Sequence, residues 1–313
     1  MDNKVKMGFL LTVLLIACLV LQYFFNYAVD FVIFFLSFVA VREMEKLQLK
    51  SGNPTFKNVG ELACFLVFVS AFVGVLCGLS AVTIILITFG IVALLYVSVL
   101  LGSMFLIKKD MEEDEFRVVT NMSVKEFAVF KSANTLAVMI YPTLLMFFLY
   151  LLNHFNQIGF TDLSTNTKGV PMGLFSLVLL FMIVCLTDTF AMCFGKLIKG
   201  KKLCPQISPN KTISGSLMGL VGGIIGALLT YLVFFLIFRN VFTGVAFWKF
   251  IVVGFLGSVI AQGGDILESL IKRKADVKDA GDFFRSHGGV LDRFDSVLFN
   301  IPYIFVCVLM IFG

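Results

Sequence analysis

The polar side chains with the clearest chemical potential lie in the segment 262–295, which begins at the end of an apolar run. Four of them are spaced by three or four residues: Asp265, Glu268, Ser269 and Lys272. If the apolar run continues as a helix, these four side chains share one face. A carboxylate at the end of a membrane helix is costly unless a cation pairs with it. The spacing therefore predicts a site in which a divalent cation, a Lys or an Arg neutralises the carboxylates.

Later in the same segment, Gly288 and Gly289 allow the backbone to approach a ligand closely. Asp292, Arg293 and Asp295 follow at the start of the last apolar run. Carboxylates favour a helix N-terminus because they complement the helix dipole. They are also the ligands that Mg²⁺ prefers, with phosphate oxygens in its other positions. The pattern predicts phosphate and metal chemistry, and the alternative is a charged cytoplasmic loop near lipid headgroups.

A second polar group, formed by Ser208, Lys211 and Thr212, precedes another apolar run. The free N–H groups and the dipole of a helix N-terminus favour anions, so these side chains form a candidate phosphate site. An ordinary helix cap is the alternative, because Ser and Thr are common capping residues. The glycines of the apolar run that follows predict close packing against another helix. They are Gly215, Gly219, Gly222, Gly223 and Gly226.

Asp188 lies in an otherwise apolar stretch, and an ionisable residue within a membrane helix is a functional candidate by default. The alternative is an aspartate paired with a structural lysine. Asp30 and Lys131 lie near predicted helix ends, where their charged groups can reach the membrane surface, and we assign neither a role. We expect His154 in an external loop.

Lipid is the solvent that the composition predicts. The chain of 313 residues is 59% hydrophobic and 14% charged, with a mean hydropathy of +0.99. Soluble domains are about a quarter charged, because they must cover themselves with polar groups. The net charge of +5 is modest. It gives no reason to expect nucleic acid as a partner, but it suits loops that face anionic lipid headgroups.

The elements that must position these residues are membrane helices, each of which needs roughly 20 apolar residues. With the N-terminus inside, Lys and Arg gather in the inside segments, as the positive-inside rule requires. The expected fold is an all-α integral membrane protein with a cytoplasmic N-terminus and an external C-terminus. The pattern predicts about nine transmembrane helices, at 7–26, 28–41, 60–78, 80–107, 127–152, 171–195, 214–238, 247–267 and 296–313.

This topology divides the chain into two parts. Residues 1–170 supply N-terminal transmembrane helices with weak motif content, and residues 171–313 form a C-terminal transmembrane catalytic region. The basic loops 196–213 and 268–295 both face the cytoplasm, so they can share one site. We expect the active site at the cytoplasmic face of a bacterial-type cell membrane or of an internal membrane.

The order of residues in the last loop resembles the signature of the phosphatidate cytidylyltransferase (CDP-diacylglycerol synthase) family. That signature reads S-x-h-K-R, four residues, K-D, a small residue, and then H-G-G-h-x-D-R-h-D, where h is hydrophobic. Arg285 departs from it, because the family usually has a small residue or Pro there. The matching residues are Ser269, Lys272, Arg273, Lys278, Asp279, Gly281, Phe284, His287, Gly288, Gly289, Val290, Asp292, Arg293, Phe294 and Asp295.

Two further segments resemble the family less closely. Its S-P-K-K-T-W-E-G segment is matched by Ser208, Pro209, Lys211, Thr212 and Gly215. Asn210 replaces a Lys, and Ile213-Ser214 replaces Trp-Glu, so a carboxylate role is in doubt there. Its D-x-x-A-Y-x-x-G-[RK] segment is matched by Asp188, Ala191, Gly195 and Lys196, with Met192 in place of Tyr.

The resemblance implies that the protein joins CTP and phosphatidate to give CDP-diacylglycerol and pyrophosphate. The expected catalytic residues are Asp265, Asp292, Lys272 and Arg293. The expected ligands of Mg²⁺ are Asp265, Asp292 and Asp295, and a second cation, divalent or K⁺, is a further candidate. The expected substrate-binding residues are Ser208, Lys211, Thr212, Asp188, Arg273, Lys278, His287, Gly288 and Gly289.

The expected partners are CTP, phosphatidate and membrane lipids, and the family also implies a homodimer. Two alternatives remain open. One is a cytidylyltransferase for another lipid phosphate, of the ether or polyprenyl type. The other is an ion-coupled secondary transporter that uses Asp188 and Asp265. The transporter hypothesis predicts corresponding polar features in both halves, whereas the motifs of this chain lie in one half.

Overall fold

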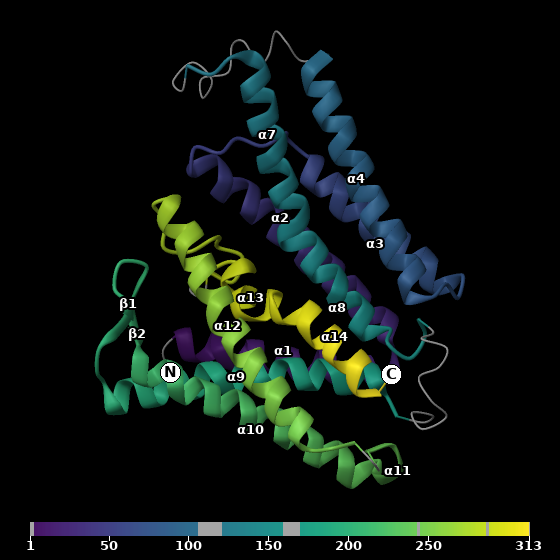
Figure 1. Cartoon of the computed structure of the whole chain (residues 1–313), viewed down its shortest axis with the longest axis vertical. Coiled ribbons are helices and arrows are strands. Elements are labelled where there is room, and N and C mark those ends of the chain that lie inside the picture. The colour runs from purple at the N-terminus through teal and green to yellow at the C-terminus, as the bar shows by residue number, and fades with distance from the viewer. Residues whose placement is uncertain (1–2, 106–120, 159–169, 243–244, 286–287, 313) are drawn as a thin grey trace.

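The computed structural model describes residues 3–105, 121–158, 170–242, 245–285 and 288–312, and most of them are helical (Figure 1). The first elements are α1 (Asn3–Phe24), α2 (Asn26–Lys50), α3 (Val59–Leu76), α4 (Ala81–Phe105), α7 (Val124–Val138), the π-helical turn η1 (Met139–Leu144) and α8 (Leu145–Asn153). The later elements are α9 (Met172–Ile198), β1 (Lys202–Cys204), β2 (Ser208–Thr212), α10 (Ile213–Ile237), α11 (Arg239–Phe242), α12 (Trp248–Lys274), α13 (Leu291–Leu298) and α14 (Asn300–Phe312).

Seven helical segments of the described chain are long and apolar enough to cross a membrane, so the expected all-α integral membrane protein is confirmed at this level. Each of them overlaps one of the predicted spans from 60–78 onward. The predicted spans 7–26 and 28–41 fall in α1 and α2, which are not among the seven. The seven are Val59–Leu76, Ala81–Ser103, Val124–Asn153, Met172–Ile198, Ile213–Ile237, Trp248–Lys274 and Leu291–Phe312.

The helices form two groups, which Figure 1 shows in different parts of the view. In one group α3 packs against α2 and α4, and α7 packs against α4. In the other group α10 packs between α9 and α12, and α1 lies along α9. The last helix, α14, contacts both α8 and α9 and so joins the two groups. This arrangement brings the N-terminal helix α2 within reach of α13.

A short hairpin departs from the all-α expectation for the loop 196–213. Strands β1 and β2 pair antiparallel, with Lys202 opposite Thr212 and Cys204 opposite Ser208. The segment is too polar to extend either neighbouring membrane helix, and its backbone groups bond across the hairpin because they need partners. Since β2 runs directly into α10, the hairpin holds Lys211 beside the start of that helix.

Glycines bring α10 close to two neighbouring helices, as the sequence predicts. A methyl group on Gly226 would overlap the backbone carbonyl of Met182 in α9. A methyl group on Gly223 would overlap the carbonyl of Gly254 in α12. Small residues at such contacts allow helix backbones to approach closely within a membrane. The predicted packing role of the glycines in this helix is therefore confirmed.

A buried polar cluster corrects the expectations for Asp30 and His154. His154 follows α8 directly and is fully buried, and its Nε2 lies 2.7 Å from Asp30 Oδ2. The side-chain amide of Asn153 donates to Asp30 Oδ1 at 2.8 Å. Asp30 therefore does not extend to the membrane surface. Its carboxylate is paired inside the helix bundle, because an ionisable group in an apolar surrounding needs a polar partner.

We expect Asp30→Ala to lower the free energy of unfolding by about 3–5 kcal/mol, because it leaves the buried His154 without its carboxylate partner. Thermal unfolding of the purified variant in detergent measures the effect. Ser98→Ala is the control, since it removes an exposed hydroxyl that donates to Leu94 of its own helix. Equal melting temperatures for the two variants would contradict a stabilising Asp30–His154 pair.

Candidate active site

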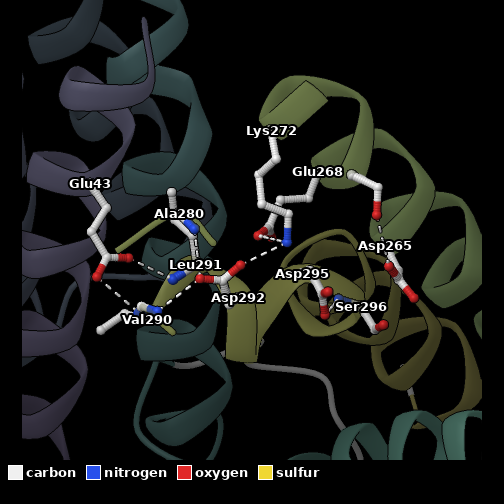
Figure 2. Close-up of polar contacts among 12 residues, drawn as sticks. Glu43, Asp265, Glu268, Lys272, Ala280, Val290, Leu291, Asp292, Asp295 and Ser296 are labelled. Carbon is white, nitrogen blue, oxygen red and sulfur yellow. Dashed lines mark hydrogen bonds and ion pairs between the residues drawn. The ribbon is translucent and has the colours of Figure 1, made fainter. Parts of the chain in front are cut away.

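The face of α12 that the sequence predicts is formed in the structure. Asp265, Glu268 and Lys272 point from this helix toward α13 and the hairpin (Figure 2). The helix α13 comes close because Gly264 has no side chain, and a methyl group there would overlap the backbone of Asp295. The two segments of the loop signature, before and after the glycines, thus meet at one place.

Lys272 is at the centre of this group. Its Nζ lies 2.7 Å from Asp292 Oδ1 and 3.1 Å from Glu268 Oε1. All three side chains are largely removed from solvent, with exposed fractions of 12% for Lys272, 1% for Glu268 and 5% for Asp292. Buried charges are found paired because an isolated charge is very costly to desolvate. The lysine neutralises carboxylates from both helices and ties α13 to α12.

Asp292 binds backbone as well as Lys272. Its Oδ2 accepts the N–H of Ala280 at 2.7 Å and the N–H of Gly289 at 2.8 Å. Gly288, which has a φ torsion of 78°, makes the turn before it, as expected for a glycine of this loop. Both oxygens of Asp292 are therefore occupied by donors from the protein. The metal role expected for Asp292 would require it to give up these donors.

Asp265 is where the two predicted polar groups meet. Its Oδ2 lies 2.6 Å from Lys211 Nζ of β2, and its Oδ1 accepts the Ser269 hydroxyl at 3.4 Å. The exposed fractions of Lys211 and Asp265 are 24% and 28%, so this pair is more accessible than the Lys272 group. The Lys211 ammonium nitrogen itself is buried, so the exposed part of this pair that a cation can reach is on the side of Asp265.

Two further aspartates lie near Asp265. The carboxylates of Asp188 in α9 and Asp295 in α13 are close enough to Asp265 to repel it. Asp188 accepts a hydrogen bond from the Ser296 side chain, and Asp295 accepts the Ser296 N–H at 2.6 Å. Asp188 of α9 therefore lies beside α13. Lys211 forms its ion pair with Asp265. Among the described residues, Asp188 forms no ion pair with a lysine, so the alternative of an aspartate paired with a structural lysine is not observed.

Other predicted site residues have structural contacts in this arrangement. The hydroxyl of Thr212 accepts the N–H of Gly215 at 3.1 Å, which is the ordinary helix cap that the sequence left open as an alternative. Arg273 donates from Nε to the Ile207 carbonyl at 3.3 Å and so holds the hairpin against α12. Ser208 is the first residue of β2, opposite Cys204.

Three candidates remain. Lys278 and Arg293 are exposed at the surface. His287 lies outside the described residues. Arg285, where the sequence departs from the family pattern, has a φ torsion of 51° and accepts the N–H of Gly288. It thus occupies a left-handed position of the turn, which is a conformation that glycine adopts more easily than arginine.

Two site residues were missed in the sequence. Glu43 of α2 is buried and accepts the N–H groups of Val290 and Leu291 at 3.0 and 2.9 Å. A carboxylate just after an apolar stretch is a signal that could have found it. Tyr141 of η1 donates its hydroxyl to Glu268 at 3.4 Å, and nothing in the local sequence pattern marks it.

The donor types at this site suit a hard cation in part. No three His, Cys, Asp or Glu side chains within the described ranges are arranged to hold a metal ion by themselves. Mg²⁺ needs fewer, because it is usually bound by one or two carboxylates together with substrate phosphates. Asp265 and Asp295 fit this requirement, since they repel each other and Asp265 is accessible. Asp292 fits it less well, because its side chain is 5% exposed and binds a lysine and two backbone N–H groups.

Comparison with known proteins shows which proteins this chain is similar to. A sequence model of the cytidylyltransferase family matches residues 4–311. A phosphatidate cytidylyltransferase of Staphylococcus saprophyticus is 36% identical over 155 residues, which are 49% of this chain and 55% of that protein. One of Rickettsia felis is 41% identical over 129 residues, covering 41% of this chain and 56% of that protein.

A third such relative, from Staphylococcus haemolyticus, is 39% identical over 130 residues, or 42% of this chain and 47% of that protein. The chain thus spans about half the length of the curated relatives that it matches. The family model, in contrast, extends over nearly the whole chain and includes every residue of the site described above. The protein belongs to the cytidylyltransferase family.

Proposed function

We propose that this protein transfers a cytidylyl group from CTP to phosphatidate and so forms CDP-diacylglycerol and pyrophosphate. The observation that carries the proposal is the ion pair between Lys211 and Asp265, which joins separate signature segments beside the buried Lys272 group. The names of the relatives support phosphatidate as the acceptor, since they are called phosphatidate cytidylyltransferases.

The reaction suits a site that has charges but no strong base. A phosphate monoester oxygen attacks the α-phosphorus of CTP, a new P–O bond forms, and the bond to the β-phosphate oxygen breaks to release pyrophosphate. A monoester is largely a dianion near neutral pH, so its oxygen does not need to lose a proton to the protein. The protein has to neutralise and position several phosphates instead.

The Lys211–Asp265 pair is the proposed place where substrate phosphates bind. Lys211 would turn from Asp265 to a phosphate, because a substrate that carries several negative charges competes with a single carboxylate for the ammonium. Asp265, once free of the lysine, would face a cation together with Asp295. Lys272 would stay with Glu268 and Asp292 and hold the loop in place, since these three side chains are buried together.

Magnesium is the proposed cofactor, and a second cation, divalent or K⁺, is a further candidate for the same group of carboxylates. Bound near Asp265 and Asp295, Mg²⁺ would neutralise the triphosphate and stabilise the leaving pyrophosphate. We retain Asp265 and Asp295 as proposed ligands. For Asp292 we now propose a positioning role, because its carboxylate is 5% exposed and already holds Lys272, Ala280 and Gly289.

The finer membrane topology is also part of the proposal. We propose nine spans with the N-terminus in the cytoplasm, which requires α1 and α2 to cross the membrane in addition to the seven long apolar segments. The distribution of Lys and Arg supports this orientation. It puts the hairpin and the last loop on the cytoplasmic side, where CTP is available. We further propose a homodimer as the functional unit.

The experiment that tests the proposal is turnover of the purified protein with radiolabelled CTP, phosphatidate and Mg²⁺ in detergent. We expect a labelled product that extracts into organic solvent, and we expect EDTA to abolish it, because the phosphates would lose the cation that neutralises them. If labelled product forms only with an ether or polyprenyl phosphate, that lipid phosphate is the acceptor in place of phosphatidate. No labelled lipid with any of these acceptors would contradict cytidylyl transfer.

We expect Asp265→Asn to lower kcat by about 100-fold or more, because one charge that orients a cation at the reacting phosphates is lost. The variant should still unfold cooperatively on heating, since the side chain of Asp265 is 28% exposed. Asp276→Asn is the matched control: Asp276 is exposed at the end of α12 and has a φ torsion of 52° that Asn also tolerates. Near-normal turnover by the Asp265 variant would refute its assignment to the metal.

A further inference from the structure

The last loop is held by a carboxylate from the opposite end of the chain. Glu43 lies late in α2, beyond the apolar stretch of that helix, and its exposed fraction is 5%. Its Oε1 accepts the N–H of Val290 at 3.0 Å and its Oε2 accepts the N–H of Leu291 at 2.9 Å. Burial raises the pKa of Glu43, while these two donors act in the opposite direction. Each oxygen of the carboxylate therefore has its own backbone partner.

Two glycines of the loop make room for this side chain. A methyl group on Gly281 or on Gly289 would overlap the Glu43 carboxylate. Neither glycine has a positive φ torsion, so the backbone at both positions could accept another residue. Their small size is required by the contact with Glu43 and not by the turn itself. The glycines of the signature and the glutamate outside it therefore form one fitted unit.

Glu43 and Asp292 together bind three consecutive amides. Asp292 accepts the N–H of Gly289, and Glu43 accepts those of Val290 and Leu291 (Figure 2). These amides lead into the first residue of α13, so their position sets where that helix begins. Asp292 lies in this first turn and extends to Lys272. A shift of the three amides would thus move Asp292, and with it the buried lysine.

We propose that Glu43 is a positioning residue of the active site, which fixes the start of α13 so that Asp292 and Asp295 lie against α12. This inference rests on the proposed cytidylyl transfer for its effect on catalysis. It also gives the N-terminal helices a direct part in the site, although the motifs all lie in the C-terminal region. Glu43 touches neither of the proposed phosphate-binding groups, so it acts through the loop.

The first test compares Glu43→Gln with Glu45→Gln. Glutamine has one acceptor oxygen for two N–H donors, so one amide loses its bond while the side chain keeps its size. Hydrogen exchange at Val290 and Leu291 should become about tenfold faster or more, and kcat should fall by a similar factor, because each lost buried bond is of this order. Exchange in α9 and α10 and the melting temperature should stay close to those of the unchanged protein.

Glu45 is a suitable control because it lies on the same helix and is partly buried, but it bonds Gly60 and not the loop. Burial raises the pKa of Glu45 to about 7, so a neutral glutamine resembles the form that it often has near neutral pH. We expect Glu45→Gln to leave exchange of the loop amides and kcat unchanged. A purely structural role for Glu43 would instead raise exchange throughout the protein and lower the melting temperature.

The second test uses the contact with the glycine. Gly281→Ala should lower kcat by about tenfold in the unchanged protein, because its methyl group overlaps the carboxylate, but much less in a Glu43→Ala background. This pair also tests the contact if Glu43→Gln fails to fold. If the effects of the two changes on kcat are independent, Glu43 and Gly281 do not act together and the proposal is wrong. Unchanged hydrogen exchange of the loop amides in Glu43→Gln would also contradict it. If the unchanged protein shows no turnover, the proposed function fails, while the exchange experiment still decides the role of Glu43.

Discussion

The structure of the site depends on the neutralisation of buried carboxylates by a single lysine. Lys272 ends a membrane helix in which Glu268 is almost fully buried, and it reaches Asp292 of the next helix at 2.7 Å. Removing any one of these charges from water is unfavourable unless the others compensate it. The loop between α12 and α13 must therefore fold back on α12, and this return brings Asp295 and Asp265 near one another.

Backbone contacts then fix what the charges bring together. The N–H groups of Ala280 and Gly289 bond Asp292, and those of Val290 and Leu291 bond Glu43. Four amides of an irregular segment are thus satisfied by two carboxylates, which is required where the backbone has no helix or sheet to bond. The buried part of the site is held in this way, whereas the side chain of Asp265 is 28% exposed.

Local patterns were enough to predict much of this architecture. The spacing of Asp265, Glu268 and Lys272 predicted their common face because helix periodicity is a local property, and the glycines of α10 predicted its close packing. Contacts between distant segments could not be predicted in the same way. Nothing near Asp30 indicates that His154 is its partner, and the bond between Glu43 and Leu291 joins residues that only the tertiary fold brings together. The new role proposed for Asp292 has the same cause, since which carboxylate is buried depends on helix packing.

A double-mutant cycle on the stability of Lys272→Met and Asp292→Asn tests the central claim most directly. The two variants and their combination would be unfolded by heat or denaturant in detergent. If Lys272 neutralises Asp292, Lys272→Met lowers the free energy of unfolding by about 3–5 kcal/mol, because it leaves the buried Asp292 and Glu268 without their cation. Asp292→Asn lowers it by less, because Lys272 keeps its contact with Glu268. The combination should then cost little more than Lys272→Met alone, with a coupling of at least about 1.5 kcal/mol. Additive losses would mean that the two charges do not depend on each other, and would contradict the account of how the site is held together.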